Sequence, residues 1–214
     1  MEGNLEKEAR KGTTTIGLVC KDGIVLVADR RVSAGYFIAS KKIKKIYKIT
    51  TNVAVTTAGM VSDAQLVIKL IQAELRLKKI RTGKEPSVKE SVNLLAAILY
   101  SNIRRPSMLP SIVGMLLGGK DEEGFHLFEI GPDGSITEAD DFISNGSGSP
   151  LAYGVLEAMY QKNMSLQEAI KLATKAINSA IQRDMPTGDG IDIVTITEKG
   201  VEILPTKQIE RVIQ

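Results

Sequence analysis

The feature that most constrains the fold is an unbroken apolar run, Ile24-Val25-Leu26-Val27, inside a stretch that we predict as a β-strand. Successive side chains of a strand point to opposite faces of its sheet, so an apolar residue at every position means that both faces are covered. The Asp22-Gly23 turn joins this strand to a preceding one, residues 13–21, as a hairpin. A hairpin buried on both faces belongs in the middle of a layered domain.

The other predicted elements come in blocks of strands separated by pairs of helices. The predicted strands cover residues 13–21, 24–29, 44–49, 53–57, 112–117, 125–130, 136–143, 191–197 and 201–204. The predicted helices begin at capping patterns that start at Ser62, Ser87 and Ser165, at an N-cap Ser149 followed by Pro150, and after Pro205. Such blocks indicate an α+β fold with helices on the outer faces of antiparallel sheets. Two sheets facing each other between helix layers explain strands that are apolar on both sides.

Histidine and cysteine chemistry is almost absent from the 214-residue chain, which contains only His126 and Cys20. One cysteine excludes a disulfide within the chain, and the two residues together are too few for a four-ligand zinc site. A Ser-His-Asp triad or a Cys-His pair would have to use His126. Both residues fall in predicted strands, where a structural role is more typical. Most familiar hydrolytic machinery is therefore excluded or depends on one residue.

The charge balance and the N-terminus limit which binding partners and which cellular compartment are expected. The chain has 28 Lys and Arg against 25 Asp and Glu, a formal net charge of +3, and this small, dispersed excess predicts no nucleic-acid partner. No window reaches the roughly 18 apolar residues of a membrane helix. Residues 1–12 are polar, lack the apolar core of a secretion signal and are expected to be a mobile leader. We therefore expect a cytoplasmic protein.

The remaining route to a hydrolytic nucleophile is an N-terminal residue. A free α-amine has a pKa near 7.7–8.0, so it can act as a general base without histidine, and a hydroxyl on the same residue is the nucleophile. Gly12-Thr13 lies where the leader meets the first strand, and glycine leaves the peptide bond between them uncrowded. Threonine is also common in ordinary strands, and on this feature alone the ordinary strand is favoured.

A lysine on an apolar strand face favours the interpretation of Thr13 as a nucleophile over that of an ordinary strand threonine. In a strand, Ile43, Lys45, Tyr47 and Ile49 share one face, on which Lys45 is the lone cation. An inward lysine needs a partner, and Asp29 at the end of the second strand is an available counter-charge. The alternative is a twisted edge strand whose lysines all reach solvent.

Six short sequence stretches, in this order along the chain, point to a particular protein family. They are Gly12-Thr13-Thr14-Thr15-Ile16-Gly17-Leu18, Ala28-Asp29-Arg30-Arg31, Thr57-Ala58-Gly59, Asp63-Ala64-Gln65, Gly146-Ser147-Gly148-Ser149-Pro150 with Tyr153-Gly154-Val155-Leu156-Glu157, and Gln182-Arg183-Asp184. Together they resemble a catalytic proteasome β subunit of the archaeal type, from Thr13 to the C-terminal helix. The resemblance implies the N-terminal nucleophile hydrolase fold, a four-layer αββα sandwich. It also implies a cleaved propeptide, residues 1–12, and a single catalytic domain, residues 13–214.

The resemblance assigns roles to individual residues. It implies that Thr13 is the nucleophile of a threonine endopeptidase, freed by autocatalytic cleavage after Gly12, with Asp29 and Lys45 beside it. The backbone N–H of Gly59 falls at the oxyanion hole, where we expect a side chain to crowd the substrate.

Three polar residues and a pocket complete the implied site. Ser147 and Asp184 match residues that hold the Thr13 amine and its water. Thr187 stands where the family often has a serine, which keeps the hydroxyl but adds a methyl. The implied substrate pocket is mostly apolar and suggests cleavage after hydrophobic residues; its lining is Val32, Ile43, Thr57 and Val61.

The resemblance also implies partners: other β subunits in a heptameric ring, flanking rings of α subunits, a regulatory ATPase and unfolded polypeptide substrates. It implies no metal or organic cofactor. Two alternatives remain, a non-catalytic ring subunit that retains its leader and a different N-terminal hydrolase. The pair of Gly12-Thr13 with Lys45 argues against the first, and the stretches at residues 146–157 and 182–184 argue against the second.

Overall fold

The hairpin at the start of the chain forms the centre of one of two stacked sheets. In the computed structural model, which describes residues 12–107 and 110–205, this first sheet has the strand order β10-β1-β2-β11-β12 and is antiparallel throughout. Its strands are β1 Thr14–Cys20, β2 Gly23–Asp29, β10 Phe142–Gly146, β11 Ile191–Thr197 and β12 Gly200–Ile203. Every residue of β2 is buried, as the apolar run predicts.

A second antiparallel sheet, of order β5-β6-β7-β8-β9, lies against the first. Its strands are β5 Ile46–Lys48, β6 Val53–Gly59, β7 Val113–Asp121, β8 Gly124–Ile130 and β9 Ile136–Ala139. Residues from both sheets, including Leu26, Leu116 and Val194, form a core between them. This inner core covers the second face of the central strands.

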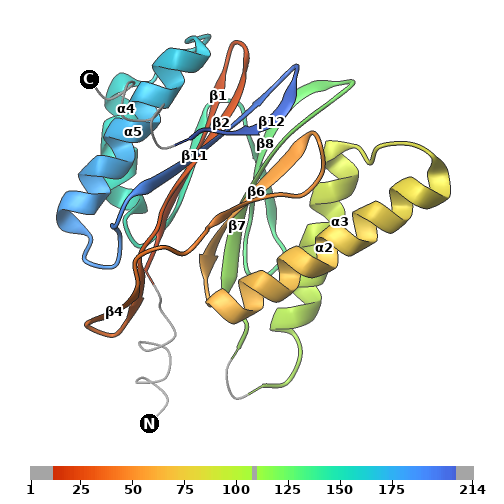
Figure 1. Cartoon of the computed structure of the whole chain (residues 1–214), viewed down its shortest axis with the longest axis horizontal. Coiled ribbons are helices and arrows are strands. Elements are labelled where there is room, and N and C mark those ends of the chain that lie inside the picture. The colour runs from red at the N-terminus through yellow and green to blue at the C-terminus, as the bar shows by residue number, and fades with distance from the viewer. Residues whose placement is uncertain (1–11, 108–109, 206–214) are drawn as a thin grey trace.

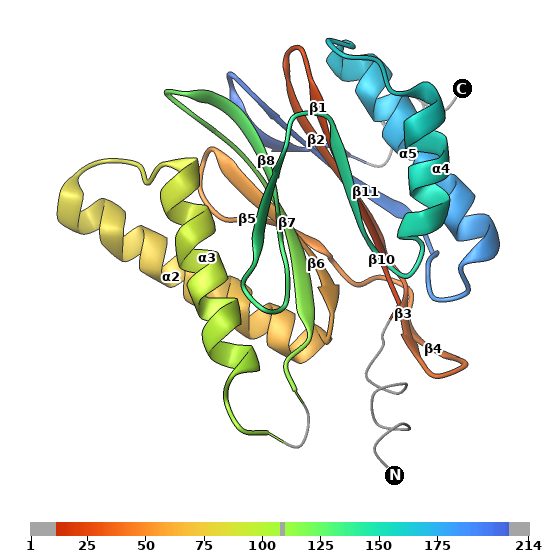
Figure 2. The same ribbon diagram turned by 180° about the vertical axis from the view of Figure 1, so that it is seen from behind.

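Helices close the sandwich on both sides (Figure 1; Figure 2 shows the same layers from behind). The pair α2 Val61–Thr82 and α3 Val88–Ile103 packs on the second sheet, and α4 Ser149–Met159 and α5 Leu166–Arg183 pack on the first. The helices α3 and α5 begin at the predicted capping boxes of Ser87 and Ser165. The predicted α+β fold, a four-layer αββα sandwich of the N-terminal nucleophile hydrolase type, is confirmed. No helix in the described part of the chain has the length and apolar character needed to cross a membrane.

The predicted strand at residues 136–143 is wrong, because this stretch forms parts of two strands. β9 pairs with β8 in the second sheet, whereas β10 pairs with β1 in the first. Asp140 and Asp141 lie between them, where the chain crosses from one sheet to the other. A run that looks continuous in sequence therefore connects the two layers.

Two helix starts differ from the prediction, and one hairpin was missed. The helix α2 begins at Val61, directly after β6, so Ser62 already lies in its first turn and forms no capping box. The helix α4 has Gly148 as its N-cap, and Ser149 is its first residue. The small hairpin of β3 Val32–Ala34 and β4 Phe37–Ser40 projects from one end of the sandwich (Figure 1). The expected helix after Pro205 and the leader up to residue 11 lie outside the described residues.

Candidate active site

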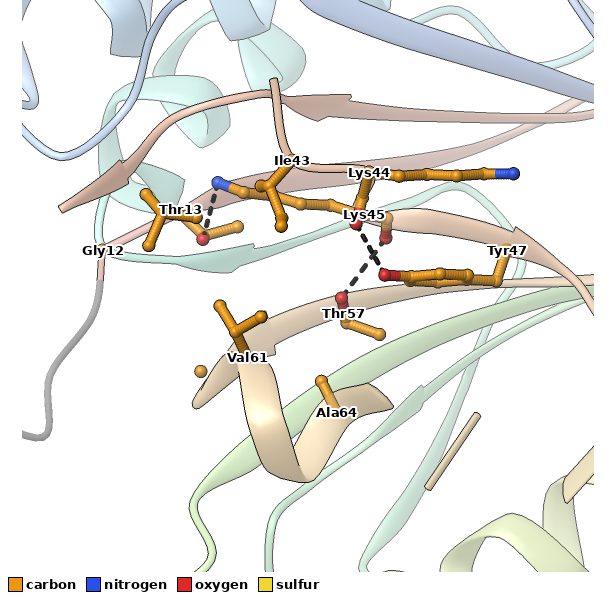
Figure 3. Close-up of a pocket in the computed structure, with 11 residues that line it drawn as sticks. Gly12, Thr13, Ile43, Lys44, Lys45, Tyr47, Thr57, Val61 and Ala64 are labelled. Atoms are coloured by element: carbon orange, nitrogen blue, oxygen red, sulfur yellow. Dashed lines mark hydrogen bonds between the residues drawn. The ribbon is translucent and has the colours of Figure 1, made fainter. Parts of the chain in front are cut away.

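Thr13 lies at the entry to the first sheet, immediately before β1, and its side chain faces Lys45 (Figure 3). Thr13 is only 5% exposed. The Nζ of Lys45 donates a hydrogen bond to the Thr13 Oγ1 at 2.8 Å. A charged donor thus contacts the one hydroxyl that sequence reasoning selected as a nucleophile.

Lys45 also forms a buried ion pair with Asp29, the last residue of β2. The Lys45 Nζ lies 2.7 Å from the Asp29 Oδ1, and the two side chains are 6% and 0% exposed. A second donor to this oxygen is the backbone N–H of Thr14, at 3.1 Å. The other oxygen of Asp29 accepts the backbone N–H groups of Arg31 and Gly188, each at 3.0 Å. The counter-charge expected from the alternation is present, and four donors hold it in place.

Burial makes the ammonium group of Lys45 more acidic. Desolvation lowers the pKa of Lys45 below its ordinary value, and the negative charge and hydrogen bond of Asp29 partly restore it. A lysine with a lowered pKa exchanges a proton more readily near neutral pH than an exposed lysine does. Lys45 is therefore suited to a site in which a proton moves during the reaction.

A second polar cluster comes from the end of α5 and the loop before α4, and it contacts Thr14, the residue after Thr13. The Oδ2 of Asp184 accepts hydrogen bonds from the hydroxyls of Ser147, at 2.6 Å, and Thr187, at 2.5 Å. Ser147 is exposed, whereas Thr187 is buried. The structure therefore brings together the three polar residues that only the resemblance pointed to.

Gly59 ends β6 beside the start of α2 and lines the same pocket as Thr13. Its φ is +126°, and a Cβ at this position would lie 2.2 Å from the carbonyl oxygen of Ile112. A side chain is thus excluded by the backbone of the neighbouring strand region, a reason that differs from the expected crowding of substrate. The N-terminus of α2 adds a partial positive charge at this point, which favours a developing anion.

A small pocket opens beside Thr13 (Figure 3). All four residues expected in its lining are present: Val32, Ile43, Thr57 and Val61. Lys44, Tyr47 and Ala64 also line it and were missed. Tyr47 could have been found, since it shares the face of Lys45 in the alternation; its hydroxyl donates to the Lys44 carbonyl at 2.7 Å.

Two further residues next to the site were missed by sequence reasoning. Arg31 pairs with Asp189 at 2.7 Å and donates to the carbonyl of Met185 at 2.7 Å, which fastens the loop after α5. Thr14 contacts both Asp29 and Thr187. Each lies close in sequence to a residue already selected, and only that adjacency could have drawn attention to it.

His126 and Cys20 take no part in this cluster. His126 lies on β8, where its ring contacts Glu138 of β9 at 2.9 Å, and Cys20 is a buried free thiol. Among the described residues, no group of three His, Cys, Asp or Glu side chains could hold a metal ion. The chemistry of this arrangement is that of a hydroxyl, an ammonium group and carboxylates.

Comparison with known proteins places the chain in a family. The family model described as "Proteasome subunit" matches residues 9–196. The chain is 48% identical over 204 residues to a proteasome subunit beta of Ferroglobus placidus, covering 95% of each chain. It is 44% identical over 207 residues to one of Methanocaldococcus vulcanius, covering 96% of this chain and 91% of the relative. A proteasome subunit beta of Archaeoglobus profundus is 44% identical over 213 residues, covering 100% of this chain and 97% of the relative. The chain therefore belongs to the proteasome subunit family, as a β subunit of the archaeal type.

Proposed function

We propose that the chain is a threonine endopeptidase made as a precursor, with residues 1–12 as the propeptide and residues 13–214 as the catalytic domain. One observation carries the proposal: the Lys45 Nζ donates to the Thr13 Oγ1 at 2.8 Å while it is paired with the buried Asp29. A buried cation held against a hydroxyl stabilises the alkoxide that develops when this hydroxyl attacks a carbonyl.

The free amine of Thr13 serves as the base in the reaction. It accepts the hydroxyl proton as the Thr13 oxygen bonds to the peptide carbonyl carbon, and the Gly59 N–H stabilises the resulting oxyanion. The carbon–nitrogen bond then breaks, and the proton passes to the leaving amine, which leaves an ester on Thr13. Water attacks this ester with the same amine as base, which releases the carboxylic acid and regenerates the hydroxyl. Ser147 and Asp184 orient the amine and the water.

Leader removal uses the same hydroxyl on the bond that precedes it. Attack of the Thr13 hydroxyl on the Gly12 carbonyl carbon forms an ester and breaks the carbon–nitrogen bond to Thr13, and the hydroxyl proton passes to the Thr13 nitrogen. The attack is intramolecular, which favours it. Water then hydrolyses the ester and releases the leader as a carboxylic acid. Gly12 is closely packed, because a Cβ there would lie 2.0 Å from the Cβ of Pro186 and 2.7 Å from the Ser147 Oγ. A glycine before Thr13 fits this space without displacing either neighbour.

The pocket and the family define the substrate and the partners. The pocket beside Thr13 is largely apolar, with Val32, Ile43 and Val61 in its lining, so cleavage after hydrophobic residues is expected. As a proteasome β subunit the chain assembles with other proteasome subunits; we propose a heptameric β ring between α rings. A regulatory ATPase then supplies unfolded polypeptide.

The test is the intact mass of the purified, assembled protein. A mature chain that begins at Thr13 is expected, together with peptide hydrolysis that Thr13→Ala abolishes. The Thr13→Ala chain is also expected to retain residues 1–12. A wild-type chain that begins at Met1 or Glu2, with no species starting at Thr13, overturns the proposal in favour of a non-catalytic ring subunit that retains its leader.

A further inference from the structure

We propose that Thr14 is a positioning residue of this active site, whose hydroxyl is the first donor in a hydrogen-bond chain that ends on Asp184. The inference rests on the proposed peptidase function. It concerns the residue directly after the nucleophile, for which the sequence suggested only a place in a strand. Its role follows from the number of protons that the buried hydroxyls can donate.

Thr14 and Thr187 form a pair of buried hydroxyls. Both residues are 0% exposed, and their Oγ1 atoms lie 2.8 Å apart. The Thr187 hydroxyl has a single proton and donates it to the Asp184 carboxylate at 2.5 Å. Thr14 must therefore be the donor in the contact with Thr187, and the chain runs in one direction, from Thr14 through Thr187 to Asp184.

Two donors converge on one oxygen at the end of this chain. The Ser147 hydroxyl donates to the same Asp184 Oδ2 at 2.6 Å. Among the described residues, none donates a hydrogen bond to the Asp184 Oδ1. Donation from Thr14 polarises the Thr187 hydroxyl and strengthens its bond to the carboxylate. In the proposed function, Oδ1 is therefore the oxygen that can accept a hydrogen bond from the amine that cleavage frees at Thr13.

Thr14 also connects the two acidic groups of the site. Its backbone N–H donates to the Asp29 Oδ1, the oxygen that pairs with Lys45. The loop before α4 leaves space for its hydroxyl, since a Cβ on Gly148 would lie 2.2 Å from the Thr14 Oγ1. Thr14 is thus hydrogen-bonded to Asp29 directly and to Asp184 through Thr187.

Loss of the Thr14 hydroxyl should change the pKa of the Thr13 amine, which is the base of the reaction. Without the Thr14 hydroxyl, the Asp184 carboxylate is less neutralised and stabilises the ammonium form of Thr13 more strongly, so the pKa of that amine rises. Because the neutral amine is the base, the acidic limb of kcat/KM moves to higher pH. The surrounding charged side chains of Asp29, Arg31, Lys45 and Asp184 remain in place.

The experiment compares Thr14→Val with Thr14→Ser in the assembled particle. Thr14→Val keeps the branched shape and removes the hydroxyl; we expect kcat for peptide hydrolysis to fall about threefold to tenfold, with little change in KM. The acidic limb of kcat/KM should move to higher pH in the same variant. Thr14→Ser keeps the hydroxyl and is expected to restore both values. Should Thr14→Val fail to assemble, Thr14→Ala gives the same comparison with Thr14→Ser.

A double-mutant cycle with Thr187→Val tests whether Thr14 acts through Thr187. In the Thr187→Val background, Thr14→Val is expected to have no further effect on kcat or on the pH profile. An equal drop in both backgrounds, a Thr14→Ser variant as impaired as Thr14→Val, or an unchanged kcat in Thr14→Val overturns the inference. These results differ from a failure of the proposed function, in which the wild-type particle itself neither begins at Thr13 nor cleaves peptides.

Discussion

The two carboxylates beside Thr13 are held by different kinds of donor. Asp29 accepts the ammonium group of Lys45 and three backbone N–H groups, from Thr14, Arg31 and Gly188. A backbone N–H in a strand or turn cannot rotate away from its acceptor, so the position and charge of Asp29 are set by the fold itself.

Asp184 is held differently. Among the described residues, the donors to its carboxylate are the hydroxyls of Ser147 and Thr187. A hydroxyl rotates and can donate or accept, so this side of the site can adapt to a change of charge. The comparison separates a rigid half, whose residues serve both fold and chemistry, from an adjustable half, whose residues serve mainly the chemistry.

The largest effect is expected from Lys45→Ala on the rigid side. Peptide hydrolysis should fall about a hundredfold or more, and leader removal should stop, because the charged donor to the Thr13 hydroxyl is lost. The chain should still fold, since Asp29 keeps its three backbone donors, but the unpaired buried carboxylate lowers the unfolding free energy. Mass spectrometry of the assembled chain and a peptide assay measure both effects.

Lys42→Ala is the matched control, because Lys42 is an exposed lysine on the same segment. It is expected to process its leader and cleave peptides as the wild type does. Normal activity in Lys45→Ala would show that the contact with Thr13 has no part in catalysis.

Paired amide substitutions test the comparison through stability. In Asp29→Asn, the amide NH2 must face fixed donors in either orientation: Lys45 and the Thr14 N–H, or the Arg31 and Gly188 N–H groups. Such a loss in a buried ion pair costs about 3–5 kcal/mol of unfolding free energy. In Asp184→Asn, the hydroxyls of Ser147 and Thr187 can turn to accept, and the cost should stay within about 1 kcal/mol.

Denaturant unfolding of these two variants measures the difference, and peptide hydrolysis should be impaired in both. Equal stability losses would contradict the distinction between rigid and adjustable donors.

The pH dependence of the rigid side follows from burial of Lys45. Desolvation lowers its pKa below the ordinary 10.5. Because the protonated amine donates to Thr13, kcat is expected to fall on the alkaline side at a pH below that value. Between the folded and unfolded pKa values the unfolded chain binds the extra proton, so the contribution of Lys45 makes the unfolding free energy rise with pH in this window.

Unfolding measured across this pH window in the wild type and in Lys45→Met tests the assignment. The rise contributed by Lys45 should be absent from the variant. An identical slope in both proteins would show that another group titrates there.

The same contrast explains what could be predicted from the sequence. A lone cation on an apolar strand face must find a counter-charge, so the alternation around Lys45 was enough to indicate its pairing with Asp29. No comparable physical rule identifies Ser147, Asp184 and Thr187. They lie in a loop and at a helix end, where periodicity carries no information, and only the family resemblance pointed to them.

The fold, too, could be predicted only where a local sequence pattern determines the structure. Capping boxes and apolar periodicity located α3 and α5, and the doubly apolar β2 indicated two facing sheets. The crossing between β9 and β10 was missed, because pairing partners and not local pattern decide which sheet a strand joins. The hairpin of β3 and β4 was missed because its strands have only three and four residues, too few for an alternating pattern to stand out.

The smallest effect is expected from Thr187→Ser, which tests how far the adjustable side tolerates change. The serine keeps the hydroxyl that contacts Asp184 at 2.5 Å and Thr14 at 2.8 Å, so kcat should stay within about twofold of wild type. Loss of one fully buried methyl should lower the unfolding free energy by about 1 kcal/mol. Thr187→Val is the matched control, since it keeps the methyl and loses the hydroxyl. A tenfold fall of kcat in Thr187→Ser would show that the branched side chain, by restricting rotation about χ1, orients the hydroxyl, and that this half of the site is also rigid.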